Sequence, residues 1–62
     1  MNTANILKSA YKFNTLKNAL SFRSGSIQPG KWSIILGEND LYLVVTNREA
    51  SILMNAGFEL FN

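Results

Sequence analysis

Lysine beside serine or threonine is the combination in this sequence that could supply a base and a nucleophile. The chain has no histidine and no cysteine, so catalysis would need a serine or threonine hydroxyl activated by a lysine amine, with an oxyanion hole beside it. Two such pairs occur at helical spacing, Ser9 with Lys12 and Lys17 with Ser21. Serines near lysines are ordinary on solvated helix surfaces. The sequence therefore predicts that the protein is not an enzyme.

The acidic residues and the glycines predict no cofactor or metal site. Glu38 and Asp40 are the only closely spaced carboxylates, and two ligands fall short of the about six oxygens that surround a calcium ion. The lack of cysteine excludes zinc–thiolate and redox sites. Gly25, Gly30 and Gly37 do not form the glycine-rich turn that holds phosphates between a strand and a helix. We expect no cofactor, no metal and no small-molecule substrate.

Positive charge is concentrated in the first part of the chain. Residues 1–37 hold five cations and no acid, whereas residues 38–62 hold four acids and one arginine. On a continuous helix the cations would line one edge, and aromatic side chains could stack on unpaired bases. This edge is the candidate nucleic-acid surface, which consists of Lys8, Lys12, Lys17 and Arg23. Alternatively, the two oppositely charged parts of the chain fold together and partly neutralise each other.

The first 23 residues have a helical pattern. Apolar residues recur at steps of three and four from Ile6 to Leu20, which is the period of an α-helix. Asn14 could begin a second helix, so the segment forms either one helix or a kinked pair. On a single helix Leu7, Tyr11 and Phe22 would form a second apolar stripe opposite the first. A surface helix normally has one such stripe, so one of the two would have to contact something else.

A β-hairpin is expected after the loop of residues 24–30. Residues 32–36 and 41–46 are rich in β-branched and aromatic side chains and flank a polar turn. If Leu36 pairs with Leu41, one face is wholly apolar. The other face still contains Ile35, Tyr42 and Val44, so it requires at least partial cover.

The last part of the chain carries clear helix boundary signals. Thr46 and Glu49 have the spacing of a capping box, and Gly57 is suited to ending a helix. We therefore expect a helix over 48–56 and a strand over 58–61. That strand should lie beside residues 32–36 and run parallel to the strand before the helix. The predicted fold is a single α+β domain, residues 1–62, in the order α-β-β-α-β, in which residues 31–62 form a ββαβ unit with a three-stranded sheet.

The expected function is binding rather than catalysis. A small apolar domain with exposed strand edges suits a protein partner, so the chain is expected to be a regulator, an inhibitor or an assembly subunit that self-associates or binds another protein. Nucleic-acid binding is the alternative. Trp32 is expected in the core, and the candidate partner-binding residues are Leu7, Tyr11, Phe22 and Tyr42.

Features of a membrane protein are missing from the sequence pattern. No stretch approaches the ~20 apolar residues of a membrane span, and the first residues do not resemble a secretory signal. A surface-bound amphipathic helix is disfavoured because Leu7 and Phe22 interrupt the polar side. A cysteine-free chain is compatible with a reducing compartment, and we expect a cytoplasmic protein.

Overall fold

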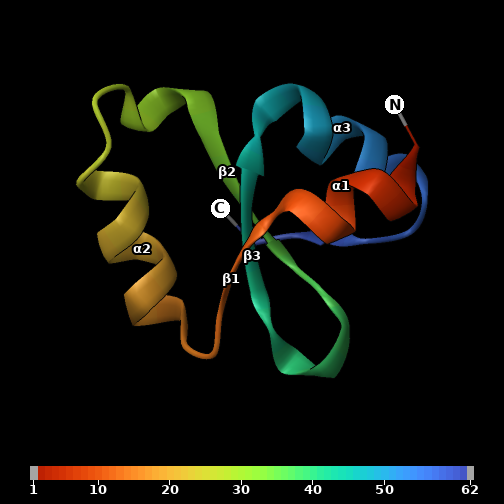
Figure 1. Ribbon diagram of the computed structural model, residues 1–62, viewed down its shortest axis with the longest axis horizontal. Helices are drawn as coiled ribbons and strands as arrows, with labels where there is room; N and C mark the ends of the chain where they lie inside the picture. The colour runs from red at the N-terminus through yellow and green to blue at the C-terminus, as the bar shows by residue number, and fades with distance from the viewer. Residues whose placement is uncertain (1, 62) are drawn as a thin grey trace.

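A four-stranded antiparallel sheet forms the centre of the molecule (Figure 1). The structure is a computed structural model that describes residues 2–61. The strand order is β1-β3-β2-β4, and the predicted α+β class is confirmed. The elements are α1 (Thr3–Ser9), β1 (Tyr11–Phe13), α2 (Leu16–Ser24), β2 (Trp32–Leu36), β3 (Tyr42–Thr46), α3 (Asn47–Asn55) and β4 (Glu59–Leu60), with short 3-10 turns at Pro29–Lys31 and Glu38–Asp40.

Helices cover both faces of the sheet. Figure 1 shows α2 on one side of the strands and α1 with α3 on the other. Each side has its own group of buried residues. The α3-side core contains Ile6, Ile35, Leu43, Val45, Ala50 and Leu53. The α2-side core contains Ala19, Ile34 and Val44, with Phe13, Leu16, Leu20, Phe22, Trp32 and Tyr42 partly buried against them. The hairpin face that was expected to require at least partial cover is covered by α2 of the same chain.

The N-terminal segment is not one helix. The Asn2 side chain caps α1 by accepting from the Asn5 N–H at 2.9 Å, and Thr15 caps α2 by accepting from the Asn18 N–H at 3.2 Å. Between them Tyr11–Phe13 is extended and pairs with β3. Of the two predicted alternatives, the kinked pair of helices is closer to the observed structure than the single helix, but neither alternative included this strand.

The strand between the helices divides both predicted apolar stripes. Ile6 of α1 belongs to the α3-side core, whereas Leu16 and Leu20 of α2 pack against the α2-side core. The chain crosses from one layer to the other through β1, between α1 and α2 (Figure 1). Leu7 and Phe22 of the second stripe are divided in the same way, so each predicted stripe is shared between the two faces of the sheet.

The hairpin register differs by one residue from the predicted one. Leu36 pairs with Tyr42 rather than Leu41, because five residues (37–41) lie between the paired residues instead of four. The Gly37 N–H donates to the Leu41 carbonyl at 2.8 Å, and Asn39 adopts a positive φ of 59°, which asparagine tolerates better than most residues. A one-residue shift exchanges the faces of one strand relative to the other. Both hairpin faces consequently contain buried aliphatic residues.

The C-terminal predictions are largely confirmed. The Glu49 N–H donates to Thr46 Oγ1 at 3.2 Å, and the Thr46 N–H donates to Glu49 Oε1 at 3.0 Å, which completes the capping box. Gly57 has a φ of 103°. Strand β4 lies beside β2, with Leu60 opposite Ile35. Since β3 and β4 are both antiparallel to β2, they run parallel to each other. The sheet differs from the predicted three-stranded one because β1 is added beside β3.

Candidate functional site

An aromatic cluster lies between β1, β2 and α2. It consists of Tyr11, Phe13, Phe22 and Trp32. The Phe22 ring centroid is 4.7 Å from that of Tyr11, 5.3 Å from that of Phe13 and 6.4 Å from that of Trp32. Phe22 thus joins α2 to the sheet, and Tyr11 remains 52 % exposed. Of these two candidate partner-binding residues, Phe22 contributes to internal packing and Tyr11 retains an accessible surface.

The opposite edge of the sheet also carries exposed apolar side chains. Leu60 is 47 % exposed and Phe61 is 48 % exposed. The Phe61 N–H donates to the Ile34 carbonyl at 2.8 Å, which extends the pairing of β4 with β2 by one residue. The Phe61 ring meets the Tyr42 ring edge-on at 5.5 Å. We call Glu59, Leu60 and Phe61 the β4 edge.

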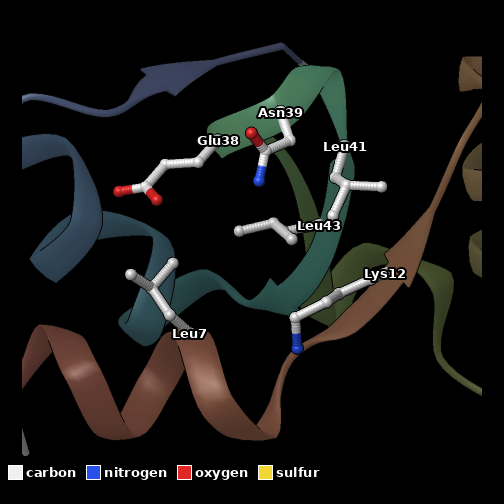
Figure 2. Close-up of a pocket in the computed structure, with 6 residues that line it drawn as sticks. All are labelled: Leu7, Lys12, Glu38, Asn39, Leu41 and Leu43. Carbon is white, nitrogen blue, oxygen red and sulfur yellow. The ribbon is translucent and has the colours of Figure 1, made fainter.

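Leu7 lines a small pocket between α1 and the hairpin (Figure 2). Leu41 and Leu43 form the rest of its apolar wall, and its volume is about 150 Å³. The Lys12 ammonium group donates to the Ala10 carbonyl at 3.2 Å. Figure 2 shows the Glu38 carboxylate on the other side of the pocket from the Lys12 ammonium. Pockets that bind small organic ligands usually measure 300–1,000 Å³, so this pocket is small for such a ligand.

The structure separates the cations of the predicted basic edge. Lys8 lies on α1 and Lys12 on β1, while Lys17 and Arg23 lie near the two ends of α2. Because α1 and α2 cover opposite faces of the sheet, the four residues do not form one strip. The sequence reasoning placed them together by assuming one continuous helix.

A different group of cations surrounds Trp32. Lys31 and Arg48 line the same hollow beside this residue, which has a volume of about 390 Å³. The Arg23 side chain donates through Nε to the Trp32 carbonyl at 3.1 Å. Arg48 was not among the residues selected from the sequence. It comes near Trp32 because β2 and β3 pair with Trp32 opposite Thr46.

Residues 2–61 show no group of three side chains suited to holding a metal ion. The helices of this part of the chain are all too short or too polar to cross a bilayer. Comparisons with protein-family models, with curated proteins and with solved structures gave no significant match. The chemistry and geometry of the chain itself must therefore carry the functional argument.

Proposed function

We propose that this protein is a non-enzymatic interaction module that binds a polypeptide partner at the β4 edge. The observation that carries the proposal is that two large apolar side chains, Leu60 and Phe61, are each about half exposed at the border of the sheet. Among the described strands, β4 has one partner, β2, and its other side is unpaired. An unpaired strand border is a template for adding a strand from another chain.

Comparison of the two borders of the sheet favours β4. Strand β1 has a central lysine, Lys12, which is a common device for preventing strand addition. The two residues that flank Lys12, Tyr11 and Phe13, belong to the aromatic cluster, and both of their rings contact Phe22. At β4 the apolar side chains project to both faces, since Leu60 is opposite Ile35 on the α3 side and Phe61 contacts Tyr42 on the α2 side. A partner strand could therefore bury apolar surface on both faces.

The exposed side chains at this border would contribute part of the binding free energy. Burying the exposed half of Leu60 and of Phe61 contributes about 1 kcal/mol each, since full burial of such side chains contributes about 1.5–3 kcal/mol. Main-chain hydrogen bonds and the side chains of the partner strand add to this. A second copy of the chain or another protein could supply that strand. We propose a role as a regulator, an inhibitor or an assembly subunit, acting in the cytoplasm.

The experiment compares the wild-type chain with Leu60→Lys. Light scattering gives the solution mass at low salt and at about 0.5 M salt, where surface charge is screened. Affinity capture from an extract of the source cells tests binding to other proteins. Ile27→Lys is the matched control, because Ile27 is 99 % exposed and belongs to the loop before β2 rather than to β4. We expect salt-resistant self-association, or capture of a polypeptide, that Leu60→Lys abolishes and Ile27→Lys retains.

Two results would contradict the proposal. One is a monomer that captures no polypeptide. The other is association that Leu60→Lys and Ile27→Lys impair to the same extent. Circular dichroism of each variant establishes that the substitution has not unfolded the chain.

A further inference from the structure

A groove crosses the end of the sheet at which β2 begins and β3 ends. Two hollows of about 420 and 390 Å³ meet there, and both are lined by Lys31 and Trp32. Ile27 lines the first, and Asn47 and Arg48 line the second. We call these five residues and the hollows between them the Trp32 groove.

Hydrogen bonds between distant segments hold the groove in shape. Asn47 Nδ2 donates to the Gly30 carbonyl at 2.8 Å, and Ser33 Oγ donates to Asn47 Oδ1. These contacts join the start of α3 to the beginning of β2. The Arg23 side chain also donates to the Trp32 carbonyl. The positions of the groove walls are thus set by the fold.

The Trp32 ring is supported from within the molecule. It meets the rings of Phe22 and Tyr11 edge-on, at centroid distances of 6.4 and 6.1 Å. It is only partly buried, so it also lines both hollows. An aromatic side chain held in this way is a rigid surface on which a flat ring can stack without much loss of conformational entropy.

The charge around the groove is predominantly positive. Lys31 and Arg48 are both exposed and line the second hollow. Arg23 does not line the hollows, but its side chain donates to the Trp32 carbonyl, so three of the six cations of the chain line the groove or contact Trp32. The nearest acid along α3 is Glu49, whose carboxylate already accepts the Thr46 N–H within the capping box. The start of α3 adds the positive end of a helix dipole.

We propose that the Trp32 groove binds single-stranded nucleic acid. A base stacks on the exposed part of the Trp32 ring, while Lys31 and Arg48 neutralise the flanking phosphates. Cations beside an aromatic surface are the common basis of single-strand binding without sequence preference. An acidic peptide would satisfy the cations but would leave the aromatic surface without a stacking partner. This surface is separate from the β4 edge, so the inference goes beyond the proposed function and does not depend on it.

The test uses the fluorescence of Trp32, which is the only tryptophan of the chain. The purified full chain is titrated with an oligothymidylate of about 12 nucleotides at about 20 mM salt. We expect quenching of the Trp32 emission as the base stacks. Two or three neutralised phosphates predict a slope of about −1.4 to −2 in a plot of log affinity against log salt, which corresponds to about a tenfold loss between 50 and 200 mM salt.

Variants locate the binding site. Arg48→Gln and Lys31→Gln should each weaken binding by about three- to tenfold. Lys17→Gln is the matched control, since it removes the same charge from the beginning of α2, and it should change affinity less than twofold. Trp32→Phe is followed by the anisotropy of a dye-labelled oligothymidylate and should also weaken binding. All four variants are checked by circular dichroism. Arg48→Lys keeps the charge and should retain most of the affinity, which separates loss of the charge from a general effect of substitution at this position.

Three results would overturn the inference. The first is the absence of quenching and of anisotropy change at about 20 mM salt. The second is an equal loss of affinity in Lys17→Gln and Arg48→Gln, which would indicate diffuse attraction to the whole chain. The third is competition by polyglutamate of similar length at the same charge concentration, which would assign the groove to an acidic polypeptide.

Discussion

The rings of Tyr11 and Phe22 lie 4.7 Å apart and connect the edge strand β1 to the helix α2. Tyr11 is half exposed, whereas Phe22 is partly buried between the sheet and its own helix. The contact therefore helps to hold α2 against the sheet at its β1 edge. The strength of this contact contributes to the stability of the packing of α2 on the sheet.

We expect Phe22→Leu to destabilise the fold by about 1 kcal/mol and Tyr11→Leu by less, because the Tyr11 side chain loses little buried surface. In a double-mutant cycle the two rings should couple by about 0.5–1.5 kcal/mol, the range for aromatic pairs. Urea unfolding followed by circular dichroism gives these values. A coupling energy of zero would show that the rings do not interact in solution.

Mutations in the α3-side core and in the α2-side core should have independent effects on stability. Ile34 and Ile35 are neighbours in β2 but belong to different cores, so we expect Ile34→Val and Ile35→Val to cost about 1 kcal/mol each and to add. Ile35→Val and Leu53→Met share the α3-side core and should couple by about 0.5 kcal/mol or more. Urea unfolding of the singles and doubles measures this. Strong coupling between the two isoleucines would contradict the three-layer arrangement.

Substitution of three glycines by alanine should change the stability of the fold in three different ways. Gly57 has a φ of 103° with open space around the added Cβ, so Gly57→Ala should cost about 1 kcal/mol from backbone strain alone. At Gly37 the Cβ would lie 2.9 Å from the Leu43 side chain, so the cost of Gly37→Ala depends on how far Leu43 can shift, and we expect about 1–3 kcal/mol. Gly30→Ala, with nothing within 4 Å, should be neutral or slightly stabilising. Thermal unfolding ranks the three variants.

The capping box gives a further prediction. Thr46→Ala removes the acceptor for the Glu49 N–H and should lower the free energy of unfolding by about 1 kcal/mol. Ser51→Ala is the control, since Ser51 is exposed on the same helix and alanine is the better helix former. Equal effects of the two substitutions would show that the cap does not stabilise α3.

Local structural features could be predicted well from the sequence, and the pairing of distant strands less well. The Thr46–Glu49 box and Gly57 depend on neighbouring residues only, and both formed as expected. The hairpin was also recognised, but its register depended on the conformations of Asn39 and Asp40, and the residue types alone allow a turn of either length. The three residues of β1 are too few to interrupt a helical pattern, so this strand was missed.

The candidate site was less accessible to prediction for the same reason. Tyr11 and Phe22 were both selected from the sequence, yet their contact arises only because β1 and α2 fold back on each other. Lys31 and Arg48 meet at Trp32 because β2 and β3 are paired. Trp32 lies opposite Thr46, two residues before Arg48.

The position of β1 has a consequence for the order in which the molecule folds. Its only strand partner among the described residues is β3, which is synthesised much later, and the two helices beside it have seven and nine residues. Helices shorter than about 12 residues are marginal in water on their own. We therefore expect the first half of the nascent chain to stay unstructured until Thr46 has left the ribosome, and the hairpin with α3 to form the folding nucleus. The N-terminal residues should then be the last to acquire protection from hydrogen exchange.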